Sequence, residues 1–247
     1  MKSLRYPRNN QSGFSLVELM IASVIGLLLT SAMLVAYVAS ARTYQIQDAM
    51  SEVQESGRFA MRILLKDLRQ SGIDIAGSQV VGVNNSVADI TDFETKWSDL
   101  VIQEKKVLSD IVYLPGLDPD GPSGPKGDDG VAYYIGLTDG VRPSLYHNKD
   151  ALVEGVVGLV IEYGVDNDGD NLVDSYKKLS AMVPADWNNV ISARFYLLMS
   201  SSATGVTDQA QQLVAPFDML NTADRRLYQV FMGTALLRNA LVVSESG

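Results

Sequence analysis

The sequence predicts an α+β protein in which one long N-terminal helix packs against an antiparallel β-sheet head. Three observations support this fold class: an uncharged apolar run near the N-terminus, a helical apolar stripe that continues it, and short apolar runs broken by glycine, proline and aspartate over the rest of the chain. Strands do not alternate with helices in the later part, so a parallel βαβ sheet is not expected.

The composition excludes several classes of function. The 247 residues include 29 acidic and 20 basic side chains, which gives a net charge of −9. A surface of that sign is repelled by phosphate backbones, so we expect no nucleic-acid partner. The chain has no cysteine, which removes disulfides, thiolate metal sites and cysteine nucleophiles.

The N-terminal segments predict a leader followed by a membrane anchor. Residues 1–13 are basic and polar, and no small, cleavable residues follow the apolar stretch as they would in a secretory signal peptide. From Leu19 to Ala41 there are 23 residues without a charge, enough for a helix to cross about 30 Å of hydrocarbon once. We therefore expect a leader over residues 1–13 and a transmembrane helix over residues 14–41. The positive-inside rule keeps the leader cytoplasmic and exports the acidic remainder.

Glu18 is the one charge near the start of this apolar segment. It has two interpretations from residue physics alone. It is either a first-turn acid at the membrane interface, favoured by the helix macrodipole, or a carboxylate that lies among packed apolar helices and needs a cation.

The segment from Gly13 to Ala22 reads GFSLVELMIA. It resembles the processing site of type IV prepilins and type II secretion pseudopilins. The resemblance implies that prepilin peptidase cuts between Gly13 and Phe14, and that the new terminal Phe14 is N-methylated. It also implies that Glu18 pairs with the terminal amine of a neighbouring subunit during assembly.

Residues 42–72 are predicted to continue the helix in amphipathic form. Arg42, Arg62 and Lys66 fall off the apolar stripe, and Gly72 is the expected stop. The helix should run from Phe14 to about Ser71. Its second half should carry the head on an apolar face with three- or four-residue spacing, made of Ile46, Met50, Val53, Gly57, Ala60, Leu64 and Leu68.

Residues 73–247 are predicted to form a β-rich head. The lone His147 is assigned to a loop, and no nucleophile elbow or phosphate-binding loop is found, so we expect no enzyme. The predicted strands are Ile111 to Leu114, Val131 to Leu137, Leu159 to Tyr163, Val190 to Met199, and Leu227 to Leu237.

The head also contains an aspartate-rich segment, DNDGDNLVD, from Asp166 to Asp174. Alternating carboxylates on a tight loop suit Ca²⁺, which takes six to eight oxygen ligands. The candidate ligands are the side chains of Asp166, Asp168, Asp170 and Asp174 and the carbonyl of Leu172. The segment lacks the glycine and the bidentate glutamate of an EF-hand. The alternative interpretation is therefore an acidic hairpin loop with an Asp-Gly turn.

Three further segments resemble the PilW family of type IV minor pilins: GRFAMRILLKDLRQSG from Gly57, LVEGVVGLVIEYGVDNDGD from Leu152, and RRLYQVFMGTALLRN from Arg225. The resemblance implies a minor pilin that takes part in type IV pilus assembly, in a priming or tip complex, and hence in twitching motility and adhesion. It would lie in the inner membrane with a periplasmic head and then in the filament at the cell surface.

The implied partners are other minor and major pilins, prepilin peptidase and a tip adhesin. Two alternatives share some of these features. A type II secretion pseudopilin would share every N-terminal feature, and a membrane-tethered calcium-dependent binding module would share the anchor and the aspartate loop.

Overall fold

The computed structural model describes residues 13–70, 81–83, 110–115, 130–139, 141–183 and 185–237. The chain divides into two compact units, Met1–Gln45 and Ile46–Gly247, and the long helix contributes to both. The elements of the described residues, in order, are α1 (Leu16–Gln70), β1 (Val81–Val83), β2 (Ile111–Pro115), β3 (Gly130–Thr138), β4 (Arg142–His147), β5 (Asp150–Glu154), β6 (Val156–Val165), β7 (Ser175–Lys178), η1 (Leu179–Ala181), η2 (Asp186–Asn189), β8 (Val190–Ser200) and β9 (Tyr228–Leu236).

The single long helix confirms the prediction for residues 14–71 to within two residues at its start and one at its end. Its N-terminal part is apolar, and its hydroxyl side chains bond within the helix. For example, the Ser23 hydroxyl donates to the Met20 carbonyl (2.8 Å) and the Thr30 hydroxyl to the Gly26 carbonyl (2.8 Å). Such internal bonds satisfy polar groups that lipid cannot. The predicted leader before Gly13 and the predicted stop at Gly72 lie outside the described residues.

The amphipathic half of α1 buries most, but not all, of the predicted stripe. Val53, Gly57, Ala60, Leu64 and Leu68 are buried, together with Ala49 and Met61. The head leaves two members of the stripe exposed, Ile46 at 39% and Met50 at 47%. Helical periodicity identifies the apolar face, but it does not show where the head begins to cover it.

The first sheet is a five-stranded antiparallel meander in the order β1-β2-β3-β4-β5. Its tight turns use Asp139 and Asn148, both with positive φ, a conformation that aspartate and asparagine tolerate better than most residues. Asn148 also secures the β4–β5 turn to β3, because its side-chain oxygen accepts a hydrogen bond from the Ala132 amide (2.8 Å). The β3–β4 and β4–β5 pairs are therefore local hairpins.

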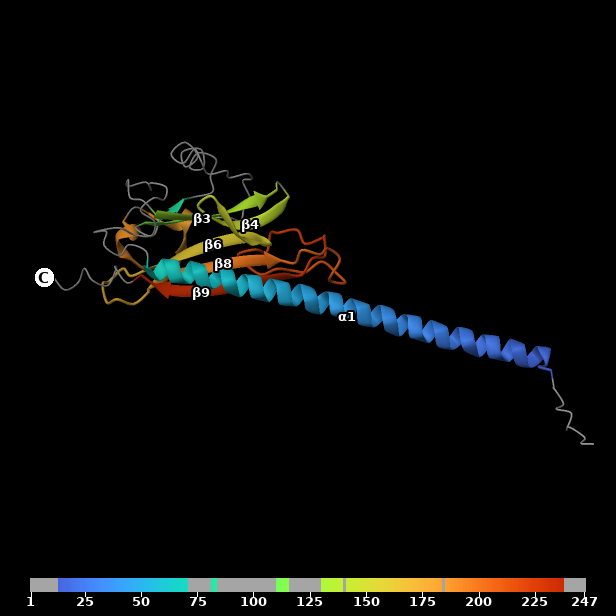
Figure 1. The fold of residues 1–247 in the computed structure, drawn as a ribbon. Helices are drawn as coiled ribbons and strands as arrows, with labels where there is room; N and C mark the ends of the chain where they lie inside the picture. The colour runs from blue at the N-terminus through green and yellow to red at the C-terminus, as the bar shows by residue number, and fades with distance from the viewer. Residues whose placement is uncertain are drawn as a thin grey trace, which may run out of the picture. The chain divides into compact units, whose positions relative to one another are not determined.

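The second sheet has four antiparallel strands in the order β7-β6-β8-β9. In Figure 1, β6, β8 and β9 lie side by side along the C-terminal half of α1. The 27 residues between β8 and β9 return over one face of this sheet, where the Phe217 ring fills the space beside Gly158. Phe217 packs there with Val160, Leu198 and Tyr228.

One hydrophobic core joins the helix to both sheets. It contains Val53 and Leu64 of α1, Tyr133 of β3, and Ile161 and Phe195 of the second sheet. Polar contacts reinforce it, since the Tyr133 hydroxyl donates to the Asp67 carboxylate (2.5 Å). The arrangement confirms the predicted α+β fold, with two sheets in the head.

All five predicted strands are present, each within a few residues of its predicted ends. Sequence analysis missed β1, β4, β5 and β7. It also placed His147 in a loop, which is wrong, because His147 is the last residue of β4 and its ring meets that of Tyr133 edge to face at 5.2 Å.

Candidate functional site

The first candidate site is the N-terminal end of α1. Gly13 and Phe14 precede the first helical residue, Leu16, so the Gly13–Phe14 bond lies in non-helical chain. Phe14 is 85% exposed, and nothing lies within 4 Å of the position a Gly13 Cβ would take. The bond is therefore open to an approaching enzyme.

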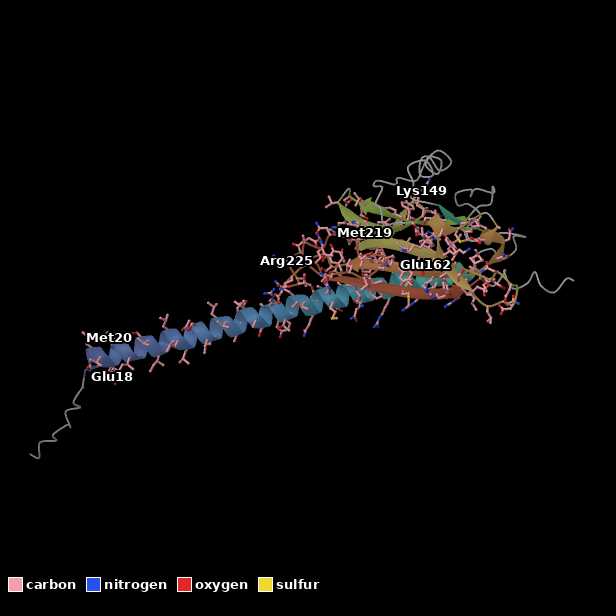
Figure 2. All side chains as sticks on the ribbon, turned by 180° about the vertical axis from the view of Figure 1, so that it is seen from behind. Glu18, Met20, Lys149, Glu162, Met219 and Arg225 are labelled. Carbon is pink, nitrogen blue, oxygen red and sulfur yellow. The ribbon has the colours of Figure 1, made fainter. Side chains whose placement is uncertain are left out.

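Glu18 lies in the first turn of α1, with Met20 beside it at the start of the helix (Figure 2). It is exposed, and no residue in the described part of the chain forms an ion pair or hydrogen bond with its carboxylate. Apolar side chains surround it along the helix, where Leu16 is 74% and Val17 is 62% exposed. A carboxylate in such a setting has reason to bind a cation from outside the subunit.

Among the described residues, one helix, α1, is long and apolar enough to cross a membrane. Its N-terminal part exposes large apolar side chains on every side, from Phe14 to Val38. An all-round apolar helix is typical of a membrane span or of a helix packed among others.

The second candidate site is the loop that joins β6 to β7. Asp166 is only 6% exposed and sits at the end of β6, where its amide donates to the Asn189 carbonyl (2.9 Å). Its two carboxylate oxygens accept hydrogen bonds from the amides of Gly169 (2.7 Å) and Asn171 (2.9 Å). Gly169 and Asn171 have positive φ values of 80° and 64°, which fold the loop tightly around the carboxylate.

The loop brings three of the four predicted side-chain ligands together. One carboxylate oxygen from each of Asp166, Asp168 and Asp174 lies within 4.8 Å of the other two. The Asp170 carboxylate is not in this group and accepts a hydrogen bond from the Leu172 amide (2.8 Å). Strands β6 and β7 flank the loop, so it is also the acidic hairpin of the alternative interpretation.

The surroundings shift the pKa values of Asp166 and Asp168 in opposite directions. Burial disfavours the charged form of Asp166, but the backbone hydrogen bonds from Gly169, Asn171 and Asp168 outweigh it and lower the pKa. For Asp168 a hydrogen bond from the Asp170 amide favours the charged form, yet repulsion from neighbouring carboxylates, with some burial, raises the pKa. A bound cation would relieve that repulsion.

The nearest lysine in sequence does not supply that cation. Lys177, on β7, donates to the Asp186 carboxylate at 2.8 Å. Its ammonium lowers the pKa of Asp186, with help from the Val183 amide. The aspartate cluster is therefore left without a partner of opposite charge among the described residues.

Comparisons with known families give two matches, and each match covers one of the two sites. The prokaryotic N-terminal methylation motif matches residues 8–34, which include Gly13, Phe14 and Glu18. The model of type IV pilus-assembly protein W, PilW, matches residues 132–239, from β3 to beyond β9 and through the aspartate loop.

The two matches support a type IV minor pilin of the PilW family. The two domains indicate involvement in type IV pilus assembly and imply interaction with other pilus components. The apolar helix under the methylation motif fits membrane anchoring. Searches of curated proteins and of solved structures each give no match.

Two features of the structure were missed in the sequence. Asp110, just before β2, donates its amide to the Leu159 carbonyl (2.7 Å) and accepts from the Ile161 amide (2.9 Å), which links the two sheets. No local pattern signals that long-range pairing. The basic residues in the second half of α1 are visible in the sequence, where they are expected only on the polar side of the helix.

Proposed function

We propose that the chain acts as a minor pilin in the priming or tip complex of a type IV pilus and so supports twitching motility and adhesion. The observation that carries this proposal is the pairing of the methylation motif at residues 8–34 with the PilW match over the head. Its mechanism would be assembly rather than catalysis, because PilW-family domains are structural.

Maturation would begin with a cut by prepilin peptidase between Gly13 and Phe14, followed by N-methylation of Phe14. The non-helical, exposed bond supports this step, since a peptidase needs an extended segment it can reach. The cut would free the Phe14 amine, and that amine would pair with Glu18 of a neighbouring subunit. The exposed Glu18 carboxylate, which has no partner in the described residues, supports this pairing.

Residues 14–41 would hold the subunit in the inner membrane as a single span, with the head in the periplasm. The same apolar surface would then enter the core of the filament, because it is exposed on every side of the helix. A tip adhesin and the major pilin are the partners expected beyond the other minor pilins.

The aspartate loop would bind Ca²⁺ through Asp166, Asp168 and Asp174. Carboxylate oxygens within 4.8 Å of one another can contact a single ion, since Ca²⁺ to oxygen distances are about 2.3–2.6 Å. The Leu172 carbonyl and water would have to complete the shell, since Asp170 lies outside the cluster. This role would make calcium a structural ligand of the β6–β7 hairpin.

The proposal is tested by deleting the gene and restoring it in the native host. We expect loss of surface pili and of twitching, both restored by the wild-type gene, with normal type II export. Lost export with normal pili would instead identify a type II secretion pseudopilin. Normal pili and normal export would favour a membrane-tethered binding module.

A further inference from the structure

The second half of α1 presents a row of basic side chains to solvent. Arg58, Arg62, Lys66 and Arg69 are all exposed, and their spacing of four, four and three residues places them on one face of the helix. We call these four residues the basic stripe. It is unusual on a chain in which acidic residues outnumber basic ones, 29 to 20.

The basic stripe has no internal partner in the part of the chain that the structure describes. Several other basic side chains of the head form ion pairs: Arg142 with Glu154 at 2.9 Å, Lys177 with Asp186 at 2.8 Å, and Arg226 with Asp224 at 3.1 Å. Like charges four residues apart destabilise a helix slightly. The helix dipole favours Arg69 in the last turn, but helix stability does not explain Arg58 and Arg62.

An open groove of about 690 Å³ runs between the stripe and β5. Arg58, Phe59 and Arg62 line its helix side, and Leu152 and Glu154 line its strand side. Glu154 is already paired with Arg142, so it does not neutralise the two arginines. Glu55, which also lines the groove, is the one other acid there.

The lining suits a protein surface that carries carboxylates. A guanidinium group binds a carboxylate through two parallel hydrogen bonds, and the exposed ring of Phe59 offers apolar contact beside it. A flat lipid surface would not reach Val153, which is 7% exposed at the strand side of the groove. A polyanion such as nucleic acid would be repelled by the net charge of −9.

We propose that the basic stripe and its groove dock an acidic face of another pilin subunit in the pilus. The proposal rests on the assembly function above, in which this chain interacts with other pilus components. The four basic side chains, which have no partner among the described residues, favour an acidic occupant. The contact would orient the head against its neighbour, a role separate from that of Glu18 at the other end of the helix.

A photo-crosslinking amino acid tests the contact in cells that assemble the pilus. Phe59 is replaced by p-benzoylphenylalanine in the full chain, which keeps an aromatic ring in the groove. Met219, 81% exposed on the β8–β9 connection, takes the same replacement as the control site (Figure 2). We expect a crosslink from position 59, and not from 219, to a subunit with its own N-terminal methylation motif, at a peptide rich in Asp and Glu.

Charge reversal then tests the basis of the contact. Arg58→Glu with Arg62→Glu should reduce the crosslink at least tenfold, and Arg225→Glu, a reversal on the β8–β9 connection, should leave it unchanged. Arg58→Gln with Arg62→Gln should also weaken the crosslink while preserving the thermal unfolding midpoint, which separates lost charge from misfolding. Acid-to-lysine changes at the crosslinked peptide of the partner should restore the crosslink to the Glu variant.

Several results would overturn the proposal: a crosslink to lipid, to a non-pilin protein or to a second copy of this chain, equal crosslinking from 219, or no effect of the charge reversals. Failure of the assembly function looks different, because piliation would then survive deletion of the gene. If deletion abolishes piliation but the Arg58 and Arg62 reversals change neither crosslink nor piliation, only the docking proposal fails.

Discussion

The aromatic ring of Phe231 on β9 occupies the space directly beside Gly57 of α1. A Cβ on Gly57 would lie less than 3.0 Å from three atoms of that ring, closer than real Cβ atoms approach their neighbours. Gly233 on the same strand meets Met61 and Leu65 in a similar way. The helix can therefore lie close to the second sheet only because small residues occur where the two surfaces meet.

Gly57→Ala should destabilise the head by about 1–3 kcal/mol. The added methyl overpacks the contact with Phe231, and this cost exceeds the roughly 1 kcal/mol that alanine gains in helix propensity. Urea unfolding of the full chain in detergent, followed by intrinsic fluorescence, measures the change.

Phe231→Leu provides the matched background for that measurement. If the two residues are in contact as described, Gly57→Ala should cost at least 0.5 kcal/mol less in the Phe231→Leu variant than in the wild type. Strictly additive costs would contradict the contact.

Asp110 should make the stability of the head depend on pH. Burial raises its pKa to about 6, although the Ile161 amide and the Lys178 charge act in the opposite direction. The folded state then binds more protons than the unfolded state between about pH 4 and pH 6. The stabilisation from protonated Asp110 is complete below its unfolded pKa of 3.8 and is lost as the pH rises through about 6.

Asp110→Asn removes this titration and keeps an oxygen that can accept from the Ile161 amide. The variant should gain stability over the wild type by up to about 3 kcal/mol as the pH rises from 4 to 7.5, because a difference of two pKa units corresponds to roughly that energy. Urea unfolding at the two pH values gives the comparison. An advantage of the variant that does not grow with pH would show that the carboxyl group is not desolvated.

Much of this fold could be predicted from sequence, because β3, β6 and β8 are largely buried and so are nearly continuous apolar runs. β4 and β5 were missed because few of their side chains are buried, Ser144 and Leu145 in β4 and Val153 in β5, so neither strand carries a long apolar run. At the candidate calcium site, residue spacing alone predicted Asp170 as a ligand together with Asp168 and Asp174. The loop, which has positive φ at Gly169 and Asn171, leaves Asp170 outside the cluster, and residue spacing does not specify those backbone angles.

Calcium should bind to the β6–β7 loop with measurable heat. Calorimetry on the full chain in detergent, after treatment with a chelator, should show binding to the wild type. Calcium at a hundred times its Kd should add about 2.7 kcal/mol of stability, which corresponds to roughly 5–10 °C in thermal midpoint for a chain of this size.

Substitutions in the loop should separate ligands from bystanders. Asp168→Asn and Asp174→Asn should abolish the heat, because each removes one of the three clustered carboxylates. Asp170→Asn is the matched control, and it should weaken binding much less, since its carboxylate lies outside the cluster. An absence of calcium-dependent heat or stabilisation in the wild type would leave the loop as an acidic hairpin only.

Glu18→Ala should prevent the subunit from entering pili without preventing its processing. Breaking a buried ion pair costs about 3–5 kcal/mol, so the amount in sheared pili should fall more than a hundredfold, while the amount in the membrane stays near normal. Mass spectrometry of the membrane-held protein should still show a methylated Phe14 at its N-terminus, because the Gly13–Phe14 bond is unchanged.

Glu18→Gln should behave like Glu18→Ala if charge is what matters. Ser23→Ala is the control within the same segment, since the Ser23 hydroxyl bonds only to the Met20 carbonyl of its own helix. Normal pilus content of the Glu18 variants would exclude the pairing with a neighbouring amine and favour a tethered protein that never enters the filament.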